Sequence, residues 1–384
     1  MKRFVRMAGA LCLAGLLLPN AALAAQPQGK SSLLMEVSTG RVLRQENPHE
    51  RLAPASVTKV MTMLLIMEAA DSGALRWDDP VTASETAAAK GGSQVYLKAG
   101  ETMSAGDMMK AIAVSSANDC ACAMAEHLAG SEEAFVERMN QRARELGMED
   151  THFVNCTGLD DGENAAEHRT SAWDIAIMSR ELLRSHPGIR DFTTIWMATI
   201  RDGTFGLSNT NRMIRFYPGA TGVKTGYTSG AGFCLSASAR REGMELIAVV
   251  MGAPTSKARF AACKSMLDYG FANFALVEPE NPGKQSVAVR LGREASVEAE
   301  PAGDGALLVE KAKRPAVIRR LSLEPEVSAP VARGQRLGTL RILAGEELLA
   351  EIPMVAAKGI PRLTWGQIFA RILGKAAMAR QVPA

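Results

Sequence analysis

Three short strings in the sequence carry side chains suited to acyl transfer. They are Ser56-Val57-Thr58-Lys59, Ser116-Ala117-Asn118 and Lys224-Thr225-Gly226. A serine hydroxyl is a poor nucleophile at neutral pH, so a neighbouring base must take its proton, and a lysine can do so only if its own pKa is depressed. Residues at i and i+3 share a helix face, which places the Lys59 amine beside the Ser56 hydroxyl. The first string therefore predicts a nucleophile with its base.

The run that follows the first string indicates where the nucleophile lies. Apolar residues between Ser56 and Ala70 follow helical spacing, and Pro54 stands just before them. Ser56 is therefore predicted in the first turn of a buried helix. The positive potential and free amides of a helix N-terminus stabilise a developing oxyanion, and the same potential disfavours protonation of Lys59.

The second string is predicted in a loop between two helices, at 105–114 and 119–129. Taken alone, Ser116 and Asn118 fit ordinary helix caps. Beside a nucleophile they gain a function, in which Ser116 relays a proton towards the leaving group and Asn118 orients Lys59 and the substrate amide. We expect this second arrangement because the other two strings are present.

The third string is predicted in a strand at 222–228. This strand begins an antiparallel meander whose further strands are expected at 233–239 and 244–251. An edge strand can bind an extended peptide through its backbone, while Lys224 and Thr225 supply a charge and a hydroxyl for a terminal carboxylate. Gly226 lets the backbone approach closely, and the amides of Ser56 and Tyr227 are the candidate oxyanion hole.

In this order, the strings resemble the motif set of the serine D-Ala-D-Ala carboxypeptidases, the low-molecular-mass penicillin-binding proteins. The resemblance covers nearly everything after residue 24. It implies an α+β fold of the β-lactamase/DD-peptidase type, with a mostly antiparallel sheet flanked by helices and a helical subdomain. It implies that Ser56 is the nucleophile and Lys59 the base. The remaining implied site residues are Ser116 and Asn118, which assist catalysis, and Lys224, Thr225, Gly226 and Tyr227, which bind substrate.

Two positions depart from the family pattern. Ala117 stands where β-lactamases carry aspartate and many carboxypeptidases glycine, and Tyr227 follows the third string where some relatives have histidine. Both substitutions keep the reaction class. Looser similarity at 92–97 and 155–159 is given no catalytic role.

The implied reaction removes the terminal D-alanine from peptidoglycan stem peptides through a serine acyl-enzyme. β-Lactam antibiotics are the implied covalent inhibitors. Residues 155–170 contain no Glu-x-x-x-Asn element to activate a water for hydrolysis of the adduct, so a long-lived penicillin adduct is expected and a β-lactamase is disfavoured. Two alternatives remain: a DD-endopeptidase of the same superfamily that cuts D-alanyl cross-links, and a catalytically idle cell-wall-binding or morphogenesis protein.

Composition narrows the range of partners. The 384 residues are 47% apolar and carry a net charge of +3, which suits a chain of more than one domain with buried cores. No basic stripe able to follow a phosphate backbone stands out, so nucleic acid is not expected as a partner. The five histidines are scattered and form no metal-binding string, so we expect no metal and no other cofactor.

Residues 1–24 have the pattern of a signal peptide. Basic Lys2, Arg3 and Arg6 precede an apolar stretch at 8–18, and Ala22-Leu23-Ala24 supplies the small residues of a cleavage site. We expect an exported chain, peripheral to the outer face of the cytoplasmic membrane or the cell wall, with a retained membrane helix as the alternative.

Five cysteines follow the signal peptide, and because the number is odd at least one of them is unpaired. We expect small apolar core residues and leave their disulfide state open. They are Cys120, Cys122, Cys156, Cys234 and Cys263.

Beyond Pro279 the pattern changes to short alternating strands broken by proline and glycine. We expect a catalytic domain at 25–275, a small all-β domain at 276–357 that acts as a spacer or interaction unit, and a helix at 358–384. The apolar face of this helix comprises Trp365, Ile368, Phe369, Ile372, Leu373 and Ala376, opposite Gln367, Arg371 and Lys375. Such a basic amphipathic helix can lie on an anionic membrane surface, and docking on its own protein is the alternative.

Overall fold

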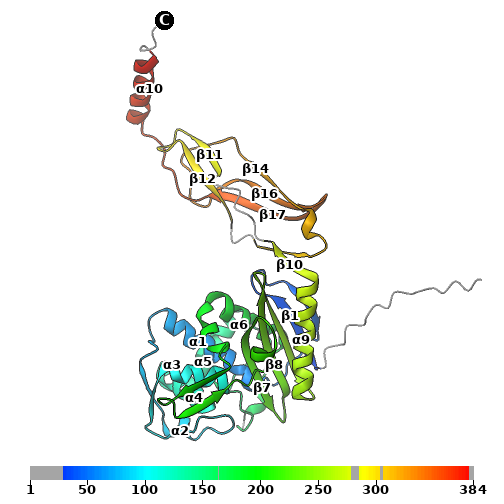
Figure 1. The fold of residues 1–384 in the computed structure, drawn as a ribbon. Helices are drawn as coiled ribbons and strands as arrows, with labels where there is room; N and C mark the ends of the chain where they lie inside the picture. Colours follow the sequence, from blue (N-terminus) through cyan, green and yellow to red (C-terminus); the bar gives the residue numbers. More distant parts are fainter. Residues whose placement is uncertain (1–28, 163, 278–284, 303–305, 380–384) are drawn as a thin grey trace, which may run out of the picture.

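The computed structural model describes residues 29–162, 164–277, 285–302 and 306–379 (Figure 1). The predicted signal peptide at 1–24 therefore lies outside the described residues. The side chains of residues 374–379, among them Lys375 and Ala376, also lie outside the described part of the chain.

The N-terminal domain is built on a five-stranded sheet with the strand order β2-β1-β9-β8-β7. Its strands are β1 Ser31–Glu36, β2 Val42–Glu46, β7 Ala220–Thr228, β8 Gly232–Arg241 and β9 Met244–Ala253. Every neighbouring pair is antiparallel, which confirms the predicted meander. β7, which carries the third string, lies at the edge of the sheet.

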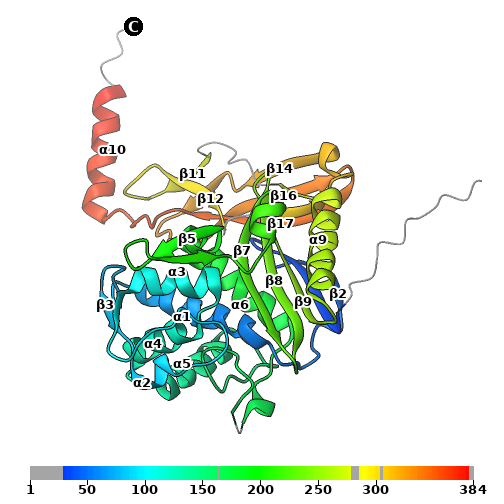
Figure 2. The same ribbon diagram turned by 60° about the horizontal axis from the view of Figure 1, so that its bottom comes forward.

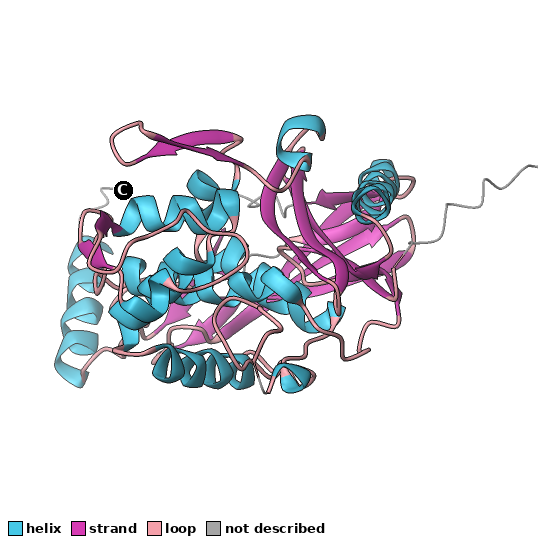
Figure 3. Cartoon of the chain, turned by 90° about the horizontal axis from the view of Figure 1, so that it is seen from below, coloured by secondary structure: helices cyan, strands magenta, loops and turns pink. Residues whose placement is uncertain are grey.

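The sheet is buried on both faces. Leu33 and Met35 face the core that the helical subdomain shares, whereas Leu34 between them faces the opposite core, as the alternation of a strand requires. α6 Ala172–Ser185 packs on β1 and β9 from one side, and α9 Ser256–Asn273 packs on β8 and β9 from the other. Figure 3 shows the strands between helices on both sides.

The helical subdomain lies beside the sheet on the α6 side (Figure 2). Ser104, Ser131 and Ser171 begin three of its helices by accepting a hydrogen bond from the amide three residues on. Its elements and their neighbours are α1 Lys59–Asp71, β3 Pro80–Thr82, α2 Glu85–Ala88, β4 Thr102–Ser104, α3 Ala105–Ser115, α4 Asn118–Ala129, α5 Glu132–Glu145, η2 Ala165–Glu167, η3 Pro187–Ile189, α7 Arg190–Thr193, β5 Met197–Ile200, β6 Phe205–Ser208 and α8 Met213–Phe216.

The helix predicted from Ser56 begins later than expected. Ser56 lies in η1 Ala55–Thr58, a 3-10 turn, and α1 starts at Lys59. The Ala55 carbonyl, which an α-helix would offer to the amide of Lys59, instead accepts the Thr58 hydroxyl at 2.8 Å. The Lys59 amide bonds the Ser56 carbonyl three residues back. The nucleophile string is therefore a tight turn joined to a helix.

The C-terminal part is an all-β domain, as predicted, called the β domain below. Its six-stranded sheet has the order β14-β16-β17-β12-β11-β15 and packs on its own core, which includes Val287, Leu337 and Met354. The elements are β11 Gln285–Arg290, β12 Ser296–Pro301, η4 Arg314–Ala316, β14 Val317–Leu323, β15 Glu326–Ser328, β16 Arg336–Ala344 and β17 Glu347–Ala356.

A two-stranded ribbon joins the two domains. β10 Phe274–Val277 pairs antiparallel with β13 Leu307–Glu310, and the Arg41 guanidinium donates to the Leu308 carbonyl at 3.0 Å. The predicted boundary between residues 275 and 276 falls inside β10, because the end of the first domain continues as a strand that pairs with the second.

The last element is α10 Trp365–Ala379, which extends from the end of the β domain opposite the N-terminal domain (Figure 1). Within the described ranges, none of the helices is long and apolar enough to cross a membrane. The five cysteines named above are all free and buried, as expected of small apolar core residues.

Candidate active site

The first string places a serine and a lysine side by side. The Lys59 Nζ lies 3.0 Å from the Ser56 Oγ, and it donates a second hydrogen bond to the Thr157 carbonyl at 2.8 Å. The spacing of the string predicts the first contact. The second comes from the stretch at 155–159, to which sequence analysis gives no role.

Burial makes Lys59 a base. The side chain is fully buried, and desolvation lowers the pKa of its amine to about 7, although the nearby Cys156 and Asp119 act in the opposite direction. A buried ammonium is costly, so the neutral amine is favoured at a pH where an exposed lysine is charged. Near neutral pH, Lys59 can therefore accept the proton of Ser56.

The second string holds two polar atoms that the protein leaves unbonded. Ser116 adopts a left-handed conformation with φ +68°, and its Oγ and the Asn118 Oδ1 are buried without a hydrogen-bond partner among the described residues. Asn118 donates through Nδ2 to the Gly91 carbonyl at 2.7 Å. Buried polar atoms without partners are costly, so these two oxygens are available to a substrate.

The expectation that Asn118 orients Lys59 is not met by a direct contact. Among the described residues, the hydrogen bonds of Lys59 go to Ser56 and Thr157. The Asn118 amide instead bonds the Gly91 carbonyl, and the Asn118 backbone bonds the Ser93 carbonyl at 2.6 Å. Asn118 therefore fixes the segment at 91–93 beside the site.

The third string reaches the nucleophile because Gly226 has no side chain. A Cβ at Gly226 would lie 2.7 Å from the Pro54 carbonyl oxygen and 3.1 Å from the Ser56 amide, too close for any other residue. Lys224 is buried and donates to the Thr225 carbonyl at 2.9 Å. Tyr227 is 55% exposed, and its ring stacks on Phe233 of β8.

Positive charge gathers around this strand. Desolvation, followed by the charges of Lys59 and Arg259, lowers the pKa of Lys224 well below its ordinary value. Arg259 extends from α9 and donates to the carbonyls of Gly226, at 2.7 Å, and Cys234, at 3.1 Å. An anionic ligand group would relieve this repulsion and restore the charge of Lys224.

Sequence analysis misses three contributors to the site. Thr157 acts through its carbonyl, Arg259 through the backbone of β7, and Thr210 through its hydroxyl, which lies 2.7 Å from the Thr225 hydroxyl. A local signal exists for Thr157. The Asn155 Oδ1 accepts hydrogen bonds from the amides of Thr157 and Gly158, and an asparagine at this position is typical of such a tight Asx turn. Arg259 and Thr210 leave no local signal.

A serine beside a buried lysine, next to a strand that carries a second lysine and a threonine, is the arrangement of a serine acyl-transfer enzyme. Known proteins resemble this chain. Residues 19–255 match the family model described as D-alanyl-D-alanine carboxypeptidase, and residues 273–362 match the penicillin-binding protein 5 C-terminal domain. The chain is 43% identical over 354 residues to the D-alanyl-D-alanine carboxypeptidase DacF of Bacillus subtilis, covering 90% of each chain. The chain belongs to the D-alanyl-D-alanine carboxypeptidase family.

Solved structures agree with this assignment. Penicillin binding protein 5 of Haemophilus influenzae is similar with a TM-score of 0.76 and 31% identity, over 88% of this chain and 98% of that one. A penicillin-binding protein of Listeria monocytogenes, solved in its ampicillin-bound form, is similar with a TM-score of 0.58 and 30% identity, over 66% of this chain and 100% of that one.

The pKa of Lys59 predicts a pH profile for acylation. Because the neutral amine is the base, the rate constant for acylation by a fluorescent penicillin should rise with pH and level off above a midpoint near the pKa of about 7. Stopped-flow labelling between about pH 5.5 and about pH 8.5 measures it, with far-ultraviolet circular dichroism as the control for folding. A rate constant that does not change across this range would contradict a titrating Lys59 base.

Proposed function

We propose that Ser56 is the nucleophile through which this D-alanyl-D-alanine carboxypeptidase releases the terminal D-alanine of a peptidoglycan stem peptide. The observation that carries the proposal is the 3.0 Å contact between the Ser56 Oγ and the fully buried Lys59 amine. In the reaction, the Ser56 Oγ attacks the carbonyl of the penultimate residue while Lys59 takes its proton.

The remaining steps use the other two strings. The amides of Ser56 and Tyr227 stabilise the oxyanion of the tetrahedral intermediate. Ser116 passes the proton to the amine of the departing D-alanine, and water then hydrolyses the acyl-enzyme. Lys224 and Thr225 bind the carboxylate of the terminal D-alanine, supported by the buried Arg259.

β-Lactams react at the same serine in this proposal. Their ring amide resembles the scissile bond, and opening the ring leaves an ester on Ser56. The structural likeness to a penicillin-binding protein in an ampicillin-bound form supports this partner. A DD-endopeptidase could use the same groups, so release of D-alanine from a pentapeptide and from a cross-linked dimer should be compared.

Replacing the nucleophile provides the direct test. Ser56→Ala should lower D-alanine release at least about a thousandfold and abolish covalent penicillin labelling, and Lys59→Ala should lose nearly as much because nucleophile and base act as a unit. Ser115→Ala is the matched control, since Ser115 bonds only the Ala111 carbonyl among the interactions described. Persistent labelling of folded Ser56→Ala protein would remove Ser56 from this role.

The role of Lys224 is separable from proton transfer. Amidating the substrate carboxylate should cost the wild type at least about tenfold in kcat/KM, and should cost Lys224→Ala much less, because the charge pair is already absent. The measurement is kcat/KM for the free and the amidated substrate, each with the wild type and with Lys224→Ala. Equal penalties would show that the carboxylate binds elsewhere.

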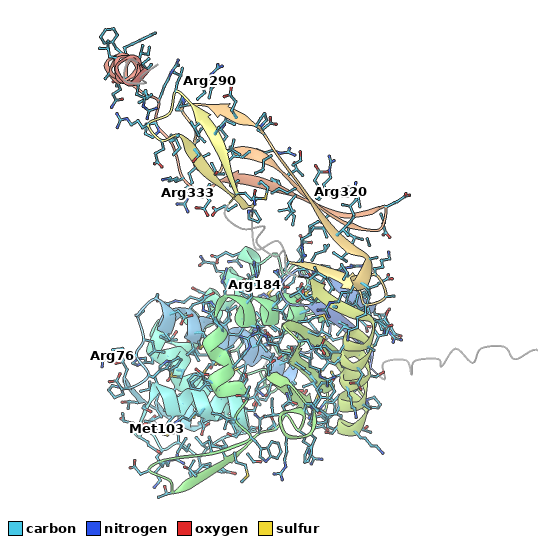
Figure 4. The ribbon with its side chains drawn as sticks, turned by 45° about the horizontal axis from the view of Figure 1, so that its top comes forward. Arg76, Met103, Arg184, Arg290, Arg320 and Arg333 are labelled. Atoms are coloured by element: carbon cyan, nitrogen blue, oxygen red, sulfur yellow. The ribbon has the colours of Figure 1, made fainter. Side chains whose placement is uncertain are left out.

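We also propose that the chain is exported after removal of residues 1–24 and that α10 holds it at a membrane surface. The proposed division is a catalytic domain at 25–275, a β domain at 276–357 and the helix at 358–384. Exposure of the apolar side chains of α10 supports the attachment: Trp365 is 86% exposed, Phe369 64% and Ile372 60%. Figure 4 shows the helix beyond the part of the β domain that carries Arg290 and Arg333.

A basic helix on an anionic membrane would direct Arg371 toward the lipid phosphates, but in the structure Arg371 contacts the protein. Its guanidinium donates to the Gly292 carbonyl at 3.3 Å and to the Arg293 carbonyl at 3.0 Å. This side chain therefore ties α10 to the β domain, and the exposed apolar face supplies most of the proposed membrane attachment.

Removing the apolar face should release the enzyme from membranes. Deletion from Leu363, or replacement of Phe369 and Ile372 by Asp, should abolish flotation with anionic vesicles while D-alanine release from a soluble peptide stays within about twofold. Leu348→Asp is the control, because Leu348 is 52% exposed on β17. A mature wild type that stays in the soluble fraction would reject the attachment.

A further inference from the structure

His168 is a buried histidine that the mechanism above does not use. Its side chain lies between the nucleophile turn and the loop that carries Thr157. The Nε2 lies 2.8 Å from the Thr58 Oγ1, and the Nδ1 accepts the Val154 amide at 3.2 Å. One ring therefore contacts both segments that surround Lys59.

The hydrogen bonds determine the tautomer of His168. The Thr58 hydroxyl has one proton, and it goes to the Ala55 carbonyl, which can only accept. The His168 Nε2 must therefore carry a proton and donate it to Thr58. The Val154 amide can only donate, so the Nδ1 must be unprotonated. The ring is neutral, with its proton on Nε2.

The turn that His168 contacts depends on Thr58. Ala55 has φ +48°, an uncommon conformation for a residue with a side chain, and the Thr58 hydroxyl bonds its carbonyl. The loop that carries Gly158 packs directly against this turn. A Cβ at Gly158 would lie 1.9 Å from the Ala55 oxygen and 2.7 Å from the Thr58 Oγ1. A shift of Thr58 must therefore move Ser56 relative to Lys59.

We propose that neutral His168 is a positioning residue for acylation: it donates to Thr58 and thereby holds the turn that presents the Ser56 hydroxyl to Lys59. This inference rests on the proposed function of Ser56 and Lys59. Burial, followed by the charges of His152, Arg169 and Lys59, lowers the pKa of His168 to about 4. The ring therefore stays neutral wherever Lys59 is a base.

Two substitutions separate the two hydrogen bonds of the ring. Asparagine places a polar atom near the Nδ1 position but is too short to reach Thr58, whereas the amide of glutamine reaches the Nε2 position and can donate there. His168→Asn should lower the acylation rate constant at least about tenfold, with the noncovalent affinity for penicillin unchanged, and His168→Gln should lose less than about threefold. His152→Asn is the matched control, because that side chain is exposed.

A substitution at Thr58 tests whether His168 acts through this residue. Thr58→Val keeps the shape of the side chain and removes the hydroxyl. It should slow acylation about as much as His168→Asn, and the double variant should be no slower than either. Nitrogen-15 spectra of the folded wild type above pH 7 should show a histidine protonated on Nε2.

Several results would overturn the proposal. The first is an acylation rate constant in His168→Asn or Thr58→Val that equals the wild-type value. The second is an equal decrease of this rate constant in His168→Asn and His168→Gln, and the third is a decrease in the double variant that equals the product of the two single decreases. The fourth is a His168 ring protonated on Nδ1. If His168→Asn does not fold, Thr58→Val alone decides. Labelling of Ser56→Ala reports on the proposed function separately, so failure of one inference is distinguishable from failure of the other.

Discussion

Burial of the Lys59 amine is the constraint on which the site depends. A charged ammonium without a close carboxylate is expensive in the protein interior, so the amine gives up its proton and becomes a base. Its hydrogen-bond partners are a hydroxyl and a backbone carbonyl, both neutral. A carboxylate in their place would restore the charge and remove the base. The nearby Asp119 is directed elsewhere, accepting the amides of Val95, Leu97 and Cys120.

The same constraint supports the proposed binding of an anionic substrate group beside Lys224. Desolvation, followed by the charges of Lys59 and Arg259, lowers the pKa of Lys224. In the proposed mechanism, the substrate carboxylate supplies the missing negative charge next to Lys224. A peptide that ends in a free carboxylate then binds better than an internal peptide segment, which suits removal of a terminal residue.

Much of this arrangement could be predicted from the sequence, because local geometry decides it. The i, i+3 spacing brings Ser56 and Lys59 together, and the strand pattern around Lys224 produces the edge strand β7. The rest depends on tertiary contacts. Arg259 reaches β7 from a helix much later in the chain. Thr157 contributes a carbonyl, which every residue type possesses, so no side chain indicates its role.

Backbone conformation escapes sequence analysis for a similar reason. Ala55 and Ser116 have positive φ although neither is glycine. Their residue types therefore do not predict a left-handed conformation. The 3-10 turn before α1 follows from a side-chain bond between Thr58 and Ala55. Apolar spacing alone predicts a helix from Ser56 and does not detect that bond.

The ribbon of β10 and β13 constrains how the two domains move. Because β13 follows β11 and β12 along the chain, the β domain is joined to the N-terminal domain by two strands and by the Arg41 bond. A body attached at two points cannot rotate freely as it could about one linker. If α10 lies in the lipid surface as proposed, the ribbon would hold the proposed nucleophile at a nearly constant height above the bilayer. The distance of a stem peptide from the membrane would then decide whether the enzyme can reach it. Stem peptides at the height of the active site would be trimmed, and those farther from the membrane would stay intact.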